Sequence, residues 1–166
     1  MIKDNFDKRC ITATTFIIDK ESKRMLFIFH KKLNKWLPTG GHVEQNEFPN
    51  EAAIREAKEE SGLDIRLIDL DVDISRLKID DSIGKNQIRP FVIVLEDVVY
   101  PKERHQHFDM VYVALAEGSR VNISAESSAY RWVDKQELDS IDTFDNVKAT
   151  ARAIFDKISN LDLSRF

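Results

Sequence analysis

Residues 41–63 read GHVEQNEFPNEAAIREAKEESGL and carry the strongest local pattern in the chain. Pro49 suits the first turn of a helix, because its φ is already helical and its missing N–H is not needed there. No helix breaker follows before Ser61, and Gly62 suits the left-handed residue that often ends a helix. The stretch therefore predicts a helix from Pro49 to Ser61.

Three carboxylates share one face of this predicted helix. Glu59 and Glu60 lie three and four positions after Glu56. On a helix this spacing brings their Cβ atoms to about 5–6 Å from that of Glu56. Taken alone, such a cluster is most often a solvated acidic face. Here residues 39–41, Thr-Gly-Gly, lie close before the helix, and a backbone carbonyl of that loop could approach the same cation. Because Mg²⁺ prefers oxygen ligands, a divalent-metal site is the alternative.

Strand patterns lie on both sides of the helix. Residues 9–18 and 25–29 are rich in β-branched and aromatic types around a polar turn, and they predict a hairpin. Segment 37–41 breaks the pattern, because paired glycines permit backbone conformations that other residues avoid. An apolar stripe from Phe144 to Leu161 predicts a terminal amphipathic helix. Further strand-like runs lie at 64–70, 91–100, 110–116 and 130–133. A mixed sheet with helices on its faces is the packing expected from this order.

The composition excludes several classes of protein. The chain has 166 residues, of which 42% are hydrophobic and 33% charged, values typical of one globular domain. The net charge of −4 argues against broad nucleic-acid binding, which leaves a basic footprint. No apolar run approaches the roughly 20 residues of a membrane span, and no export signal is visible. With a single cysteine, Cys10, a cytoplasmic location is expected. A homodimer stays open.

The stretch from residue 41 to residue 63 resembles the Nudix box. That box places Gly, Glu, Arg-Glu, Glu-Glu, Gly and an aliphatic residue at fixed spacing. The matching residues here are Gly41, Glu47, Arg55, Glu56, Glu59, Glu60, Gly62 and Leu63. Three positions depart from the usual pattern. Ala57 replaces a bulkier aliphatic residue, Asn46 stands where many members have glycine, and Phe48 stands where Ser or Thr often caps the helix. The resemblance implies an α/β fold, a Nudix-type α/β/α sandwich with a mixed, partly antiparallel sheet, in a single domain over residues 1–166.

The resemblance also implies roles for the matched residues. It implies hydrolysis of a phosphoanhydride bond that depends on Mg²⁺, for which Mn²⁺ can substitute. The implied metal ligands are the carbonyl of Gly40 and the carboxylates of Glu56, Glu59 and Glu60. The implied structural support of the site comes from Gly41, Glu47 and Gly62. The implied catalytic residues are Arg55, which pairs with Glu47 to orient the carboxylates, and Glu56, Glu59 and Glu126.

Glu126 is the candidate general base, because some carboxylate must accept the proton of the attacking water. It precedes Trp132 in a segment that resembles a ligand-bearing loop of some Nudix proteins. An ordinary loop acid is an equally good interpretation.

Several residues are candidates for substrate contact. His105, His107 and Asp109 alternate, so on a strand they share one face. A subset of Nudix proteins has a similar H-x-H-x-D stretch, which implies that these residues line the pocket. A transition-metal site of two imidazoles and a carboxylate is the alternative. His42 could meet a phosphate or lie on the surface. Trp36 could stack on a base or fill the core.

The substrate is not readable from the sequence. Lys78 and Ile79 stand where many ADP-ribose pyrophosphatases have proline, and other subfamily marks are absent as well. A nucleoside triphosphate or another nucleoside diphosphate derivative is the default expectation. The alternative function is a catalytically silent Nudix-fold domain that binds a nucleotide or sugar phosphate as a sensor.

Overall fold

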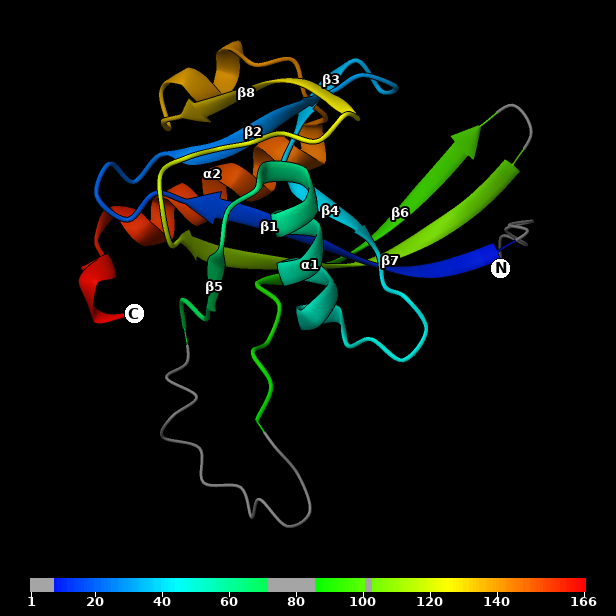
Figure 1. Ribbon diagram of the computed structural model, residues 1–166, viewed down its shortest axis with the longest axis horizontal. Coiled ribbons are helices and arrows are strands. Elements are labelled where there is room, and N and C mark those ends of the chain that lie inside the picture. The colour runs from blue at the N-terminus through cyan, green and yellow to red at the C-terminus, as the bar shows by residue number, and fades with distance from the viewer. Residues whose placement is uncertain (1–7, 72–85, 101–102) are drawn as a thin grey trace.

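The computed structural model describes residues 8–71, 86–100 and 103–166 (Figure 1). Its strands are β1 (Lys8–Ile18), β2 (Met25–His30), β3 (Lys35–Leu37), β4 (Thr39–His42), β5 (Ile65–Ile68), β6 (Val92–Tyr100), β7 (Glu103–Ala116) and β8 (Ser127–Val133). Its helices are α1 (Pro49–Ser61) and α2 (Asp145–Ser159), with short 3-10 turns η2 (Glu137–Ser140) and η3 (Leu163–Arg165). Lys78 and Ile79 lie outside the described residues.

The strands form one mixed sheet whose centre is the parallel pair β1–β7. The strand order is β3-β2-β1-β7-β5, with β4 beside β1, β6 beside β7 and β8 beside β2. All pairs except β1–β7 are antiparallel. The predicted hairpin is confirmed by the pairing of Ile18 with Met25. The predicted mixed, partly antiparallel sheet is confirmed as well.

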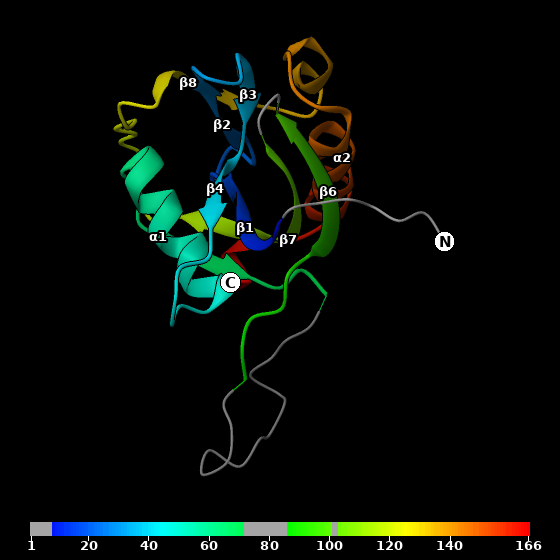
Figure 2. The ribbon, with the colours of Figure 1, turned by 90° about the vertical axis from the view of Figure 1, so that its right-hand side faces the viewer.

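The two long helices cover opposite faces of this sheet, as Figure 2 shows. Side chains of β1 alternate between the faces: Ala13 and Ile17 pack with α1, whereas Phe16 and Ile18 pack with α2. The α2 side holds the larger core, to which the helix contributes Ala151, Ile154, Phe155 and Ile158. This arrangement is the expected α/β/α sandwich.

Helix α1 lies close to the sheet because its buried face is made of small residues. Ala52, Ala53 and Ala57 are fully buried, and the hydroxyl of Thr15 donates to the carbonyl of Ala53 at 3.3 Å. A bulkier side chain at Ala57 would push the helix away from β1. The departure of this position from the box therefore corresponds to closer packing of the helix on the sheet.

The ends of α1 are as predicted, and the missing cap is replaced. Gly62 has φ +72° and donates its N–H to the Lys58 carbonyl, the geometry of a glycine that ends a helix. Phe48 has no polar side chain, but its N–H donates to the Glu51 carboxylate at 2.9 Å, which is half of a capping box. Asn46 has φ +66°, the left-handed conformation that Asn tolerates.

The prediction for segment 37–41 was wrong. Thr39–His42 is strand β4, paired with β1, and neither of its glycines has a positive φ. Because the two glycines have no side chain, neighbouring atoms can instead come close to the backbone of β4. A Cβ on Gly40 would lie 2.6 Å from the Ala13 carbonyl oxygen of β1, so the strand pair leaves no room for one.

The start of β7 was also placed too late, because residues 103–109 are polar except for Phe108 and hide the strand pattern. Pairing with β6 and β1 makes this segment a strand all the same.

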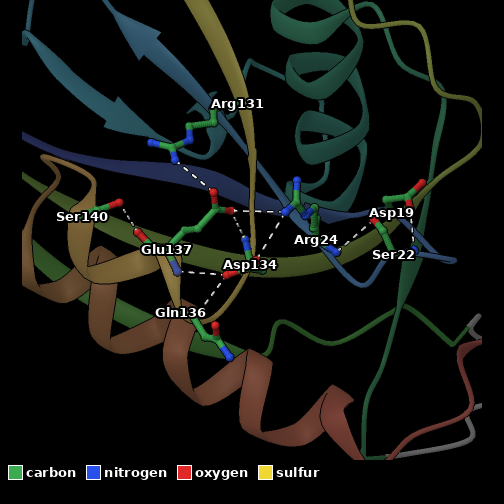
Figure 3. A network of polar contacts seen from close by, with 8 residues as sticks. All are labelled: Asp19, Ser22, Arg24, Arg131, Asp134, Gln136, Glu137 and Ser140. Carbon is green, nitrogen blue, oxygen red and sulfur yellow. Dashed lines mark hydrogen bonds and ion pairs between the residues drawn. The ribbon is translucent and has the colours of Figure 1, made fainter.

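At the other end of the sheet, a polar network connects the β1–β2 turn with the segment after β8 (Figure 3). In it, Arg24 lies 3.4 Å from Asp134 and 3.7 Å from Glu137. These side chains are only partly buried, so each ion pair contributes little to stability.

Candidate active site

The carboxylates predicted to bind metal line one cavity of about 620 Å³. Glu56, Glu59 and Glu60 reach it from α1, and Gly40 and Gly41 reach it from β4. The segment Ser124–Ala125–Glu126 before β8 also lines it. The fold therefore brings the box residues together with Glu126, which lies more than sixty positions further along the chain.

Glu60 is the most buried of these carboxylates, with 9% of its surface exposed. Its Oε2 accepts the N–H of Gly40 at 2.8 Å. Burial, followed by the nearby charges of Glu56, Glu126 and Glu59, raises the pKa of Glu60 to about 7, against the one opposing hydrogen bond. The site thus concentrates more negative charge than its protein surroundings compensate, as expected of a site for a cation.

Gly41 allows a carboxylate to approach the backbone of β4. A Cβ on Gly41 would lie 2.3 Å from Oε1 of Glu56, closer than atoms can come. Any other residue would displace that carboxylate from its present place. The glycine pair thus has two functions: Gly40 allows β4 to approach β1, and Gly41 allows Glu56 to approach β4.

Arg55 holds the acidic residues in a fixed arrangement. Its Nε and Nη2 donate to the two carboxylate oxygens of Glu47 at 2.8 and 3.0 Å, a bidentate pair that only Arg can form. Its Nη1 donates to Glu56 at 2.7 Å and to Glu59 at 3.2 Å. Nη2 also donates to the carbonyl of His42 at 3.0 Å. Hydrogen bonding to Glu47 raises the pKa of Arg55, and the same contact lowers the pKa of Glu47. Arg55 and Glu47 therefore both remain charged near neutral pH.

The segment that carries Glu126 is anchored on two sides. The N–H of Ser124 donates to the carbonyl of Glu60 at 3.1 Å, and the N–H of Lys31 donates to the carbonyl of Glu126 at 3.1 Å. The Lys31 ammonium adds a bond to the Ala125 carbonyl at 2.7 Å. These contacts hold Glu126 beside the carboxylates of α1.

A second cavity, also of about 620 Å³, adjoins the first on the α2 side of the sheet. The two cavities share Leu33, Leu37, Pro38 and Gly40. The second is lined by apolar side chains with a few polar ones, among them Thr14, Glu96, His107 and Asp109. Such a composition suits the organic part of a small molecule.

Residues 8–155 match a family model described as "NUDIX domain". The chain belongs to the Nudix family. A structure of a hydrolase of the NUDIX family from Clostridium perfringens is 37% identical, with a TM-score of 0.75 over 89% of this chain and 97% of that chain. The protein is thus a Nudix hydrolase, in a family whose hydrolases generally use a divalent metal.

More distant structures share the fold. A MutT protein from Methanosarcina mazei Go1 has 17% identity and a TM-score of 0.60 over 93% of this chain and 97% of that chain. An Ap4A hydrolase from C. elegans has 18% identity and a TM-score of 0.60 over 95% of this chain and 99% of that chain. Among curated proteins, none matches this Nudix hydrolase. No helix in the described part of the chain is long and apolar enough to cross a membrane.

The histidine stretch of this Nudix hydrolase lies on β7, with its side chains on the α2 side of the sheet. His107 and Asp109 line the second cavity. Asp109 is buried, and its Oδ1 accepts the hydroxyl of Thr12 at 2.8 Å. Nε2 of His105 lies 3.0 Å from Nε2 of His107. Burial, followed by the neighbouring rings of His42 and His105, lowers the pKa of His107 to about 4, so this imidazole is neutral at pH 7.

The grouping of His42 and of Asp109 differs from what the sequence suggested. The third residue beside His105 and His107 is His42, whereas Asp109 is bonded to Thr12. Sequence reasoning missed this grouping, since it depends on the pairing of β4 with β1 and of β1 with β7. It also missed Glu96, which is paired with His107 across β6 and β7 and lines the second cavity.

Trp36 lines neither cavity. Its ring lies edge-on to Phe29 at 5.3 Å between centroids, and it packs against the larger core. The position agrees with the core-filling alternative. His30 lines the first cavity, and its Nδ1 accepts the N–H of Leu33 at 3.2 Å, so it also holds the turn between β2 and β3.

Proposed function

We propose that the protein hydrolyses a phosphoanhydride bond in a nucleoside triphosphate or another nucleoside diphosphate derivative, with Mg²⁺ as its metal. The observation that carries this proposal is the convergence of Glu56, Glu59, Glu60 and Glu126 on one cavity, with burial raising the pKa of Glu60 to about 7. Uncompensated carboxylates of this kind are stabilised by a dication.

The chemistry of the donors fits Mg²⁺. The side chains at the cavity that could bind a cation are mainly carboxylates, and hard cations take oxygen ligands while keeping some of their water. Glu56, Glu59 and Glu60 would hold the ion, together with the carbonyl of Gly40, and Mn²⁺ would substitute. When bound, the metal neutralises charge on the phosphate oxygens and lowers the pKa of water.

The protein's own groups have three tasks in this proposal. Arg55 and Glu47 keep Glu56 and Glu59 in place through the contacts described above. Glu126, on the segment anchored to Glu60 and Lys31, accepts the proton of the attacking water as general base. The adjoining cavity takes the organic group, where Asp109 can form a hydrogen bond with it. The C. elegans neighbour, an Ap4A hydrolase, supports a nucleotide as the substrate class.

The test is a panel of nucleotides and nucleotide sugars, incubated with Mg²⁺ or with EDTA, with products separated by chromatography. We expect release of a nucleoside monophosphate only with Mg²⁺, and its loss in Glu56→Gln and Glu60→Gln. Glu51→Gln is the matched control, because Glu51 lies on the same helix and Gln still accepts the N–H of Phe48.

Two outcomes would contradict this proposal. Cleavage that persists in EDTA and in both glutamine variants would exclude this carboxylate site. Nucleotide-dependent shifts in melting temperature without any product would instead support the sensor alternative.

A further inference from the structure

Three of the four histidines of the chain meet in one place. His105 and His107 lie two positions apart on β7, and His42 ends β4. One ring nitrogen from each of the three lies within 4.8 Å of the others. The ring centroids are 4.8 Å apart for His105 and His107, 5.0 Å for His42 and His107, and 6.4 Å for His42 and His105. One nitrogen of each imidazole therefore lies close to the other two.

The fold, rather than chance contact at the surface, produces this convergence. In β1, Thr12 is paired with His42 on one side and with Asp109 on the other. Paired residues point to the same face of a sheet, so His42 lies on the same face as His107, two positions from Asp109. The carbonyl of His42 is held by Arg55 at 3.0 Å, which fixes the backbone that presents this ring.

The spacing of the nitrogens suits one small metal ion. Zn–N bonds of about 2.0–2.1 Å in tetrahedral geometry place two ligand nitrogens about 3.3 Å apart. The Nε2 atoms of His105 and His107 are 3.0 Å apart, so small ring rotations would bring them to that separation. Three imidazoles leave a fourth position for water or another ligand.

The surroundings favour a cation as well. Oε2 of Glu96 lies 3.9 Å from Nδ1 of His107, on the other ring nitrogen from the one facing His105. A carboxylate behind a ligating imidazole is a common arrangement at zinc sites. Imidazole nitrogens select Zn²⁺ and neighbouring transition metals, whereas Mg²⁺ prefers the carboxylates on the α1 side.

We propose that His42, His105 and His107 bind one divalent transition-metal ion of the Zn²⁺ type. This site is distinct from the carboxylate site, because it uses nitrogen donors on the α2 side of the sheet. It goes beyond the proposed hydrolysis and does not depend on it. A metal there would connect β4, which carries Gly40 and Gly41, to β7.

The test uses metal-free full-length protein titrated with Zn²⁺ by calorimetry and with Co²⁺ by visible absorption. Excess Mg²⁺ is present throughout to occupy the carboxylate site. We expect one equivalent of Zn²⁺ to bind and Co²⁺ to give the intense bands of a four-coordinate site. His42→Gln and His107→Gln should each lower Zn²⁺ affinity by at least about tenfold. His30→Gln, which changes the one remaining histidine, should leave it unchanged.

His42 is exposed, so its substitution leaves the core intact, and circular dichroism with thermal melting checks that each variant folds. The proposal is overturned if the wild-type protein binds no Zn²⁺ under these conditions, since the 3.0 Å contact is then only a hydrogen bond between two imidazoles. It is equally overturned if binding survives His42→Gln and His107→Gln but is lost in Glu56→Gln, because the ion is then at the carboxylates.

Discussion

At the scale of single residues, Gly41 is needed for the geometry of the site rather than for the fold. A Cβ at this position would lie 2.3 Å from a carboxylate oxygen of Glu56, the far end of a flexible side chain. We therefore expect Gly41→Ala to fold with a nearly unchanged melting temperature but with Glu56 displaced. A displacement of about 1 Å lowers activity on the order of 100-fold. Steady-state kinetics with Mg²⁺ and thermal melting measure both effects.

Gly40 provides the contrast for this prediction. Its Cβ would meet backbone atoms, the Ala13 carbonyl oxygen at 2.6 Å and the Thr14 Cα at 2.9 Å, which cannot move aside without separating β4 from β1. Gly40→Ala should therefore cost about 1–3 kcal/mol in the free energy of unfolding. Equal loss of stability in the two variants would contradict the division of roles between these glycines.

The pKa of Glu60 predicts how the stability of the metal-free protein depends on pH. Burial raises this pKa from 4.5 to about 7, so between these values the folded state binds more protons than the unfolded state. The free energy of unfolding then falls as pH rises through this window, by on the order of 3 kcal/mol from Glu60. Urea unfolding in EDTA from pH 4.5 to pH 7.5 measures this fall.

Glu60→Gln serves as the control for that measurement, because an amide does not titrate. The variant should show a smaller decrease over the same window, and added Mg²⁺ should raise the stability of the wild-type protein at the upper end. A decrease of the same size in Glu60→Gln would place its cause in other groups.

At the scale of elements, Arg55 connects helix α1 with the segment between β4 and α1. It bonds Glu47 on that segment and the carbonyl of His42 at the end of β4. On the helix it bonds Glu56 and Glu59. Arg55→Lys keeps the charge but has only one nitrogen, so it cannot form the bidentate pair and also reach the other partners. We expect activity to fall about 10–100-fold, measured as kcat and as the Mg²⁺ concentration for half-maximal rate.

Arg66→Lys is the matched control, since Arg66 on β5 forms an exposed ion pair with Glu117 that Lys can form as well. A wild-type rate for Arg55→Lys would show that charge alone, rather than the geometry of the guanidinium, orients the carboxylates.

The elements also show why part of the fold could be predicted from sequence. Helix α1 was predicted with its bounds because its signals are local: Pro49 at the start and Gly62 at the end. The short strands β3 and β4 were missed, since Lys35–Leu37 and Thr39–His42 become strands through pairing with β2 and β1. In the same way, the acidic face of α1 was readable from spacing, whereas the partnership of His42 with His107 depends on three strands that are distant in sequence.

At the scale of the whole molecule, the two faces of the sheet carry different parts of the site. The α1 side presents the carboxylates, and the α2 side encloses the second cavity, with Gly40 lining both cavities. A helix on the far side of the sheet from the carboxylates should therefore influence which substrate is accepted without touching the metal. Thr150 tests this idea, because it lines the second cavity from α2 and is only partly buried.

We expect Thr150→Phe to fill part of that cavity and to raise KM for the best nucleotide about tenfold or more, with Mg²⁺ affinity and melting temperature near those of the wild-type protein. The preceding residue, Ala149, is exposed on the same helix and lines neither cavity, so Ala149→Phe adds the same ring outside the pocket and should leave KM unchanged. Kinetics of both variants over the nucleotide panel make the comparison. If both variants keep the wild-type KM, the organic group binds elsewhere, and the α2 side of the sheet then has no part in substrate selection.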